Sequence, residues 1–489
     1  MTNALAPWFQ RRGLGLLTDF YELTMMAGYW QDERSEQQVS FNYFFRSLPP
    51  HAGFAVAAGL GPFLDYVENL RFDEDDIAYL RGLDVFEEGF LDYLASFRPT
   101  IDIHAVPEGT LVYPFEPIVQ VEGKLIEAQL IESALLNIMN YQTLIATKAA
   151  RVCLAAEGDP VLEFGLRRAH GPDGGVSGAR AAYIGGCSST SNVMAGKVYD
   201  IPVAGTHAHS WVMSYPSEIE AFRTFARLFP KKCVLLVDTY DTVESGLPNA
   251  VRVFQEMRDQ GLDFLPAVRL DSGDLAKLSK IAYRMLTEAG FENPTIVASN
   301  ELTEDLIADL KRQGAKVNAW GVGTHLITAR DNPSLNGVYK LVAVHNGAGW
   351  SPRIKISSNI EKATDPGRKA LVRYYDANGL ALGDVIYNPE ETWPETGTIA
   401  GRDRTRPHRT ARLPEAARAE PLLQPVLAQG RRVGAAPSVV ETRGHVFEQI
   451  SAMPEEFKRL RNPEYYQVLL SEQLGDLKDR LLADPDGHA

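Results

Sequence analysis

The feature that most constrains the fold of this chain is an alternation of helical segments and short apolar strands from about residue 125 to about residue 345. Strands about 30 residues apart, separated by helical spacing, indicate βα units and a parallel sheet. Six or more such units in succession favour a barrel, although an open, doubly wound sheet would show a similar pattern. The candidate strands are 161–164, 201–204, 233–237, 264–269, 295–298 and 317–320.

The segments on either side of this repeat follow other patterns. Before it, residues 17–30 predict a helix, and residues 39–45 alternate as a strand does. After it, residues 339–390 are β-rich. Residues 400–440 hold many Arg, Ala and Pro without a clear period, and we interpret them as a linker or wrapped loop. A terminal helix is expected around 463–482.

These patterns divide the chain into three segments. We expect an N-terminal α+β domain over residues 1–125 and an α/β barrel, the catalytic domain, over 126–345. Residues 346–489 then form a C-terminal β-rich segment, the linker and the terminal helix.

The charge of the chain limits what it can bind over a broad surface. It has 489 residues, with 49 Lys and Arg against 63 Asp and Glu, and a formal net charge of −14. This balance argues against extended contact with nucleic acid or an anionic membrane. A local Arg cluster can still bind an anionic substrate.

Cysteine usage and the N-terminal residues indicate the compartment. The three cysteines, Cys153, Cys187 and Cys233, are far apart, and no C-x-x-C occurs. Such a set fits a reducing compartment rather than a disulfide framework. We find no signal peptide and no stretch of about 18 apolar residues, so we expect a cytoplasmic enzyme.

Polar residues follow the candidate strands one after another, and this is the main functional signal. In a barrel, catalytic groups lie at the carboxyl ends of the strands. The first cluster runs from Glu163 to Arg168, and its two Arg could bind a phosphate or carboxylate in a bidentate manner. A solvated loop with a surface ion pair is the alternative.

His207 and His209 form the second cluster, in GTHAHSW (205–211). On a strand both would face the same side, because the side-chain period is two. They could bind a metal ion, as in barrel hydrolases, or one could act as nucleophile or phosphate acceptor. One buried, hydrogen-bonded His beside one exposed His is a further alternative. A metal site needs more ligands, and only His325 among the other histidines lies near a candidate strand end.

Acidic residues end the next two strands. In VDTYDT (237–242), a carboxylate such as Asp238 could orient a neighbouring His, or it could cap the following helix. In RLDSGDL (269–275), Arg269, Asp271 and Asp274 could serve an anionic substrate and Mg²⁺ together, because Asp usually holds Mg²⁺ alongside substrate phosphates. A capped turn is again the alternative.

Two later loops each join a strand to a helix. They are residues 299–301, with Asn300, and residues 321–324, with Gly323 and Thr324. Backbone N–H groups at a helix N-terminus attract phosphate, and Gly lets the phosphate approach. This position predicts a sugar-phosphate site, although the segment does not match the longer dinucleotide or P-loop patterns.

Taken in order, these segments resemble the nicotinate phosphoribosyltransferase family. The matching segments are TDFYELTM (18–25), EFGLRRAHGPDGG (163–175), GTHAHSW, VDTYDT, RLDSGDL, and GVGT (321–324) with NGVYKLV (336–342). The resemblance implies an irregular TIM-like α/β barrel beside a second α+β domain built from the N- and C-terminal parts. It also implies a homodimer with shared active sites.

The resemblance further implies roles for individual residues. His209 matches a histidine that ATP phosphorylates, and Asp238 matches the acid that supports it. Phe164 and Tyr21 match aromatic residues that sandwich the pyridine ring, with Tyr21 supplied by the partner subunit. The residues expected around the substrates are Arg167, Thr206, Arg269, Asp271 and Asn300, with Gly323 and Thr324 at the 5-phosphate.

The implied reaction joins nicotinate to phosphoribosyl pyrophosphate, with ATP as co-substrate, Mg²⁺ as cofactor and a phosphohistidine intermediate. It is the first step of NAD synthesis from nicotinate. We expect nicotinate rather than nicotinamide, because SSTSN (188–192) offers no carboxylate to a carboxamide N–H. The alternatives are a metal-dependent barrel hydrolase using His207 and His209, a nicotinamide- or quinolinate-type transferase, and a non-catalytic regulator.

Overall fold

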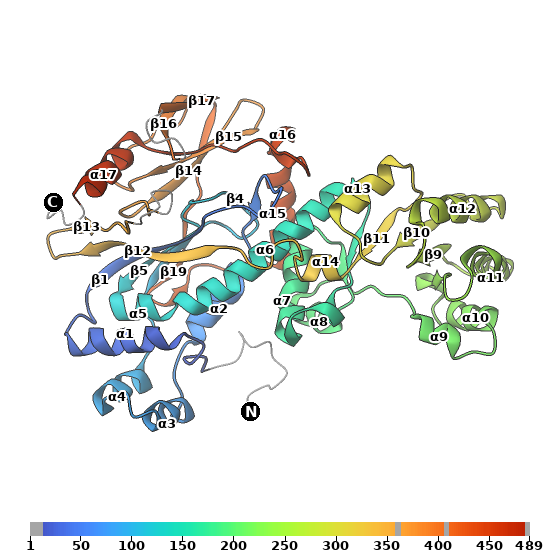
Figure 1. The fold of residues 1–489 in the computed structure, drawn as a ribbon, viewed down its shortest axis with the longest axis horizontal. Coiled ribbons are helices and arrows are strands. Elements are labelled where there is room, and N and C mark those ends of the chain that lie inside the picture. The colour runs from blue at the N-terminus through green and yellow to red at the C-terminus, as the bar shows by residue number, and fades with distance from the viewer. Residues whose placement is uncertain (1–12, 357–362, 405–409, 485–489) are drawn as a thin grey trace. The chain divides into compact units, whose positions relative to one another are not determined.

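Two compact units make up this chain, seen in a computed structural model that describes residues 13–356, 363–404 and 410–484 (Figure 1). Unit 1 comprises Met1–Thr147 and Ser334–Ala489, so both ends of the chain contribute to it, and unit 2 comprises Lys148–Pro333. The boundaries expected from the sequence, after residues 125 and 345, both fall inside unit 1. The change from unit 1 to unit 2 occurs within one long helix, α6 (Glu132–Ala156).

Unit 2 is built on a six-stranded sheet in the order β7-β6-β11-β10-β9-β8. Every neighbouring pair in this sheet is parallel, so the carboxyl ends of all six strands lie at one edge. The strands are β6 (Val161–Glu163), β7 (Ser189–Thr190), β8 (Val234–Leu236), β9 (Ala267–Leu270), β10 (Thr295–Ala298) and β11 (Ala319–Val322). The prediction of a parallel α/β sheet is therefore confirmed.

Amphipathic helices connect these strands. In α12, the buried residues recur every three or four positions, from Leu275 and Ala276 through Ser279 and Ala282 to Leu286, which forms one apolar stripe. The helices of unit 2 are α7 (Gly171–Ile184), α8 (Val193–Tyr199), α9 (His209–Met213), α10 (Glu218–Leu228), α11 (Leu247–Asp259), α12 (Leu275–Glu288), α13 (Glu304–Arg312) and α14 (Thr324–Ile327).

The predicted strand at 201–204 is wrong, and β7 was not predicted. Only Val203 pairs with the sheet, in an isolated parallel bridge to Thr190. Pro202 has no N–H to donate, which prevents a longer ladder. The chain then reaches the opposite edge strand, because the His207 ring accepts a hydrogen bond from the backbone N–H of Leu236. Residues 203–207 thus contact both edges of the sheet.

Unit 1 contains two larger sheets and one antiparallel pair of two-residue strands. The strand orders are β13-β12-β1-β5-β3-β19-β20, β17-β16-β21-β15-β14-β18, and β2-β4. Antiparallel pairs dominate: β1 (Gln38–Phe45) lies antiparallel between β12 (Gly337–His345) and β5 (Val119–Lys124). The first half of the chain is therefore joined to residues after unit 2 through a continuous sheet.

The remaining strands of unit 1 are β2 (Ala55–Val56), β3 (Asp102–Ala105), β4 (Leu111–Val112), β13 (Trp350–Pro352), β14 (Ala370–Tyr375), β15 (Ala381–Tyr387), β16 (Gly397–Asp403), β17 (Thr410–Ala416), β18 (Arg418–Pro421), β19 (Gln424–Ala428), β20 (Arg431–Arg432) and β21 (Val468–Leu470). Its helices are α1 (Phe20–Gln31), α2 (Leu60–Asn69), α3 (Glu74–Gly82), α4 (Glu88–Ser96), α5 (Leu125–Leu130), α15 (Val439–Ser451), α16 (Glu455–Lys458) and α17 (Glu472–Ala483).

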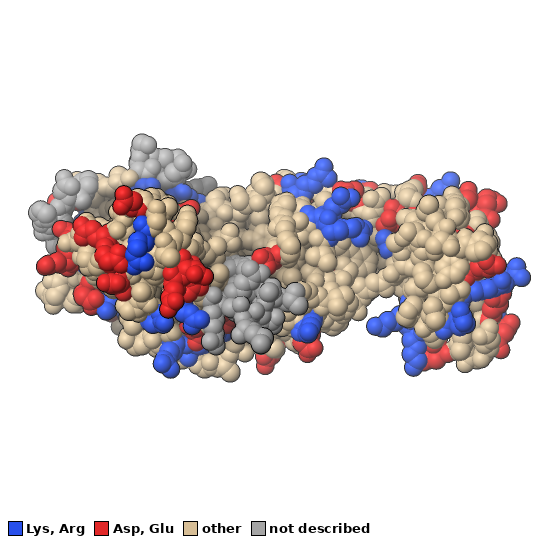
Figure 2. Space-filling view, turned by 90° about the horizontal axis from the view of Figure 1, so that it is seen from below, with Lys and Arg blue, Asp and Glu red and all other residues tan. Residues whose placement is uncertain are grey.

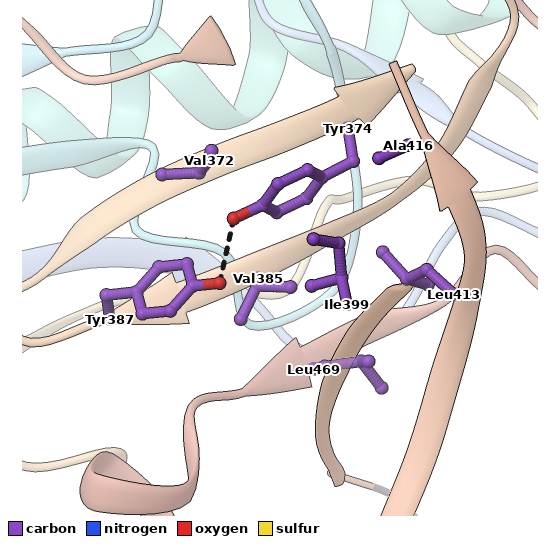
Figure 3. Packing of buried hydrophobic residues seen from close by; sticks show 8 residues of the cluster. All are labelled: Val372, Tyr374, Val385, Tyr387, Ile399, Leu413, Ala416 and Leu469. Carbon is purple, nitrogen blue, oxygen red and sulfur yellow. Dashed lines mark hydrogen bonds between the residues drawn. The ribbon is translucent and has the colours of Figure 1, made fainter. Parts of the chain in front are cut away.

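The C-terminal sheet has its own apolar core, which Figure 3 shows from close by. Two buried tyrosines, Tyr374 and Tyr387, share a hydrogen bond of 2.8 Å between their hydroxyl groups within it. This bond satisfies both hydroxyls where they cannot reach water. The other members of the cluster are Val372, Val385, Ile399, Leu413, Ala416 and Leu469.

The interpretation of residues 400–440 as a linker or loop is wrong. Apart from 405–409, which lie outside the described residues, this stretch forms the end of β16 and strands β17 to β20. In β17 only Leu413 and Ala416 are buried, and the other side chains face outward or are half-buried. Such a strand lacks a regular apolar period, so it could not be predicted from the sequence pattern.

The terminal helix is shorter than predicted. The expected range, 463–482, contains β21 as well as most of α17, which begins after its cap Ser471. The Ser471 hydroxyl accepts a hydrogen bond from the backbone N–H of Leu474, which fixes the helix start.

No helix in the described ranges is long and apolar enough to cross a bilayer. On the face seen in Figure 2, Lys and Arg side chains lie beside Asp and Glu side chains, so neither sign covers that face alone.

Candidate active site

The site of unit 2 lies at the carboxyl edge of its parallel sheet. Polar residues lie at the carboxyl ends of β8, β9 and β10: Asp238 comes two residues after β8, Arg269 is the next-to-last residue of β9, and Ser299 directly follows β10. Because neighbouring parallel strands end at the same edge, these residues come together although they are far apart in sequence.

Arg269 is the centre of the site. Its guanidinium donates to three side-chain oxygens: Thr206 Oγ1 at 2.8 Å, Ser299 Oγ at 2.8 Å and Asp271 Oδ1 at 3.0 Å. The same guanidinium lies 5.8 Å from the centre of the Phe164 ring. Its side chain is only 12% exposed. The planar guanidinium makes one hydrogen bond through each of its three nitrogens, so it is oriented before any substrate arrives, and two of its five N–H groups remain for a ligand.

Asp271 remains ionised through its neighbours. Burial raises the pKa of its carboxyl, but the hydrogen bond from Ser299 and the charge and hydrogen bond of Arg269 outweigh this and leave the pKa below its usual value. Ser299 Oγ makes a short contact with Asp271 Oδ1 as well as accepting from Arg269. The site therefore holds a fixed anion beside a fixed cation.

Asp238 holds the turn after β9. Its Oδ2 accepts hydrogen bonds from the backbone N–H of Asp271 at 2.9 Å and from Ser272 Oγ at 2.6 Å. Its Oδ1 is buried and has no hydrogen-bond partner among the residues that the structure describes. A buried, unpaired carboxylate oxygen is costly in a folded protein, so it indicates a group that awaits a ligand.

His209 begins helix α9 and faces the same site. Its Nδ1 lies 3.1 Å from Thr239 Oγ1, and its Nε2 lies 3.8 Å from Asp271 Oδ2. The side chain is 43% exposed. Within the described ranges, the carboxylate in an ion pair with His209 is that of Asp271, whereas Asp238 contacts the turn beside it.

His207 is a structural residue. Its Nε2 accepts from the backbone N–H of Leu236 at 3.2 Å, and its Nδ1 contacts the Ala208 carbonyl at 3.4 Å. Burial lowers the pKa of His207 to about 4, so the ring is neutral. With both nitrogens engaged, it cannot serve as a metal ligand beside His209. Residues 205–208 are also not a strand, so the expectation that both rings face one side is wrong.

Phe164 follows β6 and is packed against β11. Its backbone N–H donates to the Val322 carbonyl at 2.8 Å. A Cβ at Gly321 would come within 2.7 Å of the Phe164 ring, so Gly321 makes room for that ring. The aromatic surface next to Arg269 therefore depends on a glycine one strand away.

Gly323 and Thr324 form the turn into α14. The Thr324 hydroxyl donates to Glu301 Oε1 at 3.3 Å, and Glu301 also pairs with His325 at 3.0 Å and Arg330 at 3.2 Å. These contacts of Glu301 could not be predicted from the sequence, because they form only when the two loops come together. Asn300 is exposed and has a left-handed backbone with φ of 93°.

Three other predicted residues lie outside this cluster. Arg167 and its neighbour Arg168 are exposed in a short 3-10 helix, Leu166–Arg168. Asp274 caps α12 by accepting from the backbone N–H of Lys277 at 3.0 Å, which is the structural alternative considered for it. Tyr21 lies on α1 of unit 1 and is 47% exposed.

The structure adds Thr239, Ser272 and Ser299 to the predicted residues. Each supplies a hydroxyl to a charged side chain of the site. In the sequence, these three residues could have been found by their position, which is directly after a predicted strand or beside a predicted acidic residue. No group of three or more His, Cys, Asp or Glu side chains within the described part of the chain is arranged to hold a metal ion.

These features define an α/β protein with a hydrogen-bonded cluster of Arg, Asp, Ser and Thr side chains at the carboxyl edge of a parallel sheet. Sequence models match nearly the whole chain. The nicotinate phosphoribosyltransferase (NAPRTase) N-terminal domain matches residues 16–140, the nicotinate phosphoribosyltransferase (NAPRTase) family matches 160–378, and the nicotinate phosphoribosyltransferase C-terminal domain matches 368–478. The chain belongs to the nicotinate phosphoribosyltransferase family, and it is an enzyme.

Individual relatives agree with this assignment. A nicotinate phosphoribosyltransferase of Bacillus subtilis (strain 168) is 45% identical over 95% of this chain and 94% of its own length. One from Homo sapiens is 35% identical over 96% of each chain. The crystal structure of human nicotinic acid phosphoribosyltransferase superposes with a TM-score of 0.84, at 33% identity over 95% of this chain and 99% of that chain.

Proposed function

We propose that this enzyme transfers the phosphoribosyl group of phosphoribosyl pyrophosphate to nicotinate and couples this reaction to ATP through His209. The observation that carries the proposal is the position of His209 beside the Arg269–Asp271 pair. A reactive imidazole lies next to an oriented guanidinium that can bind the anionic groups of both substrates.

The nicotinate ring has a candidate support in Phe164. Its aromatic face lies near the Arg269 guanidinium, which can attract the nicotinate carboxylate or a ribose-linked phosphate. We assign Tyr21 of the partner subunit to the opposite face of the ring, because Tyr21 is exposed on α1. This assignment requires a homodimer, which we propose together with it.

The 5-phosphate of the ribose would bind at the turn into α14. Backbone N–H groups at the start of a helix lack partners within the helix, and Gly323 has no side chain to hinder approach. Thr324 then supplies a hydroxyl that now contacts Glu301. Asn300 and Arg167 would contribute from the neighbouring loops.

The chemistry requires alignment and charge stabilisation more than a strong base. The pyridine nitrogen forms a bond to C1 of the ribose while the bond from C1 to the pyrophosphate oxygen breaks, and pyrophosphate keeps the electron pair. Positive charge develops on the ribose as the bond breaks, so Asp271 is placed to stabilise it. Thr206 and Ser299 hold Arg269 in place for the negative leaving group.

His209 would take the γ-phosphoryl group of ATP, with release of ADP, and later lose it to water. A phosphoryl group on His209 would lie beside the pyrophosphate of the donor. Its presence or loss would therefore change the affinity for substrates and products, which couples ATP hydrolysis to synthesis.

Mg²⁺ fits this site through Asp238 and Asp271. Asp238 Oδ1 is a buried oxygen without a partner, and Asp271 is held ionised. Mg²⁺ usually combines one or two carboxylates with substrate phosphates, and it would neutralise the charge on the leaving pyrophosphate. Asp274, which we expected to share this role with Asp271, caps α12 through its Oδ1.

We also propose that the sheet of unit 2 is the wall of an irregular barrel. Residues 203–207 contact both edge strands, through Val203 on one side and His207 on the other. A segment that spans both edges supports closure without a full strand.

The test is nicotinate-dependent release of pyrophosphate, measured with and without ATP. We expect His209→Ala to lose the stimulation by ATP and most of the activity. His345→Ala, on β12 of unit 1, is the matched control and should behave as the wild type does. Full ATP-stimulated turnover by His209→Ala would refute the role of His209.

A further inference from the structure

The imidazole of His209 is held by a residue that lies outside the predicted set. Thr239 Oγ1 lies 3.1 Å from Nδ1, a hydrogen-bond distance. The other nitrogen, Nε2, is 3.8 Å from Asp271 Oδ2, which is too long for a hydrogen bond but close enough for charge attraction. The ring is therefore fixed in place at Nδ1 by a hydroxyl.

His209 needs this support because its own segment is short and open. It begins a helix of five residues, and its side chain is 43% exposed. An exposed ring on a short helix can rotate about its side-chain torsions at little cost. Phosphoryl transfer, by contrast, depends on close alignment of the attacking atom with the phosphorus.

Thr239 is well supported. It lies in the loop after β8, between Asp238 and the helical turn that begins at Thr242. Asp241 accepts from the backbone N–H groups of Val243 and Glu244, which caps that turn. Gly246 packs so closely that an added Cβ would lie 1.8 Å from the Val237 carbonyl oxygen. The backbone around Thr239 is thus held on both sides, as a positioning residue requires.

We propose that Thr239 is the positioning residue of His209: its hydroxyl orients the imidazole for phosphorylation by ATP. This inference rests on the proposed role of His209. A threonine hydroxyl can donate to a bare ring nitrogen and accept from a protonated one. Thr239 can therefore keep its contact when the proton at Nδ1 changes, whereas the Asp271 carboxylate can only accept.

The test compares Thr239→Val, which keeps the shape but lacks the hydroxyl, with Thr239→Ser, which keeps the hydroxyl. The readout is the rate at which radiolabelled ATP forms an acid-labile, base-stable phosphate on the protein. We expect Thr239→Val to lower this rate on the order of ten- to a hundredfold, as loss of alignment of the attacking imidazole would. Thr239→Ser should stay within about threefold of the wild type.

Controls separate positioning from folding. Thr287→Val makes the same change at a hydroxyl that bonds only to its own helix, at the Tyr283 and Arg284 carbonyls, and should label as the wild type does. Thr239→Ala provides a second variant without the hydroxyl if Thr239→Val does not fold. Equal labelling of Thr239→Val and wild type, or equal loss in the Ser and Val variants, would overturn the proposal.

The failure of this inference is distinguishable from failure of the proposed function. If the wild type itself gains no phosphate, or gains it equally after His209→Ala, the role of His209 is wrong. If the wild type is labelled at His209 and the hydroxyl makes no difference, only the role of Thr239 is wrong.

Discussion

The backbone N–H of Asp271 donates a hydrogen bond of 2.9 Å to the Asp238 carboxylate, so the end of β8 holds the end of β9 in place. The hydroxyl of Ser272 reaches the same oxygen. One carboxylate oxygen thus fixes a turn, while the other is buried and unpaired among the described residues. A substitution of Asp238 can therefore test the structural role of one oxygen separately from the chemical role of the other.

Asp238→Asn should keep the fold but lose activity. The amide oxygen can still accept from Asp271 and Ser272, whereas the amide nitrogen replaces the unpaired oxygen and cannot bind a cation. We expect kcat to fall on the order of a hundredfold, with little change in Tm. Asp238→Ala should lower both kcat and Tm, because the turn after β9 also loses the oxygen that accepts from Asp271 and Ser272. Full turnover by the Asn variant would show that the unpaired oxygen has no catalytic use.

Arg269→Lys should be severely impaired although it keeps the charge. A lysine ammonium cannot reach Thr206, Ser299 and Asp271 in the plane that the guanidinium occupies. We expect kcat/KM for phosphoribosyl pyrophosphate to fall on the order of a hundredfold. Arg258→Lys, on α11 beside Phe291, is the control and should retain normal kinetics. Near-normal kinetics in Arg269→Lys would contradict the central role of this network.

Nicotinate should be the preferred base. The segment 188–192 has no carboxylate that could accept from a carboxamide N–H, and Arg269 favours an anion. We expect nicotinate to give a kcat/KM at least on the order of a hundredfold above that for nicotinamide. The measurement is pyrophosphate release with each base in turn, and equal efficiency would refute the preference.

His207 should make the stability of the protein depend on pH. Its pKa is lowered by burial from 6.5 to about 4, so the unfolded chain binds a proton more readily between these pH values. The stability that neutral His207 contributes is thus complete above pH 6.5 and is lost as the pH falls towards 4.

The variant for this prediction is His207→Gln, whose amide can replace both ring contacts without titrating. Relative to the variant, the wild type should lose on the order of 3 kcal/mol of unfolding free energy between neutral pH and pH 4. Urea unfolding at a series of pH values would measure the difference. If the unfolding free energies of the two proteins changed with pH in the same way, the His207 ring would not be held neutral.

The strands that carry the site could be predicted because their sequence has two coincident signals. In β8 to β11 a short apolar run is followed at once by polar residues, as at Val237–Asp238. This places Asp238, Arg269 and Asp271 at one edge without knowledge of the fold. Hydrogen bonding cannot be predicted in this way, because Thr239 and Ser299 resemble any other hydroxyl residues until the strands are assembled.

The missed regions have a different physical cause. Strand β7 has two residues, Ser189 and Thr190, and it exists because β6 pairs with it at the edge of the sheet. Strands β17 to β20 are held by their partners and present many charged side chains to solvent. Local composition does not reveal a strand whose stability comes from distant residues.

Strand β1 lies between β5 and β12 in the sheet. Because β12 comes almost three hundred residues later in the chain, one edge of β1 stays unpaired until the ribosome has synthesised β12. At ordinary rates of translation this delay is on the order of tens of seconds. During that time the nascent chain exposes an unpaired, mostly apolar strand, a known hazard for aggregation. Production of this protein should therefore respond strongly to chaperone supply and to growth temperature.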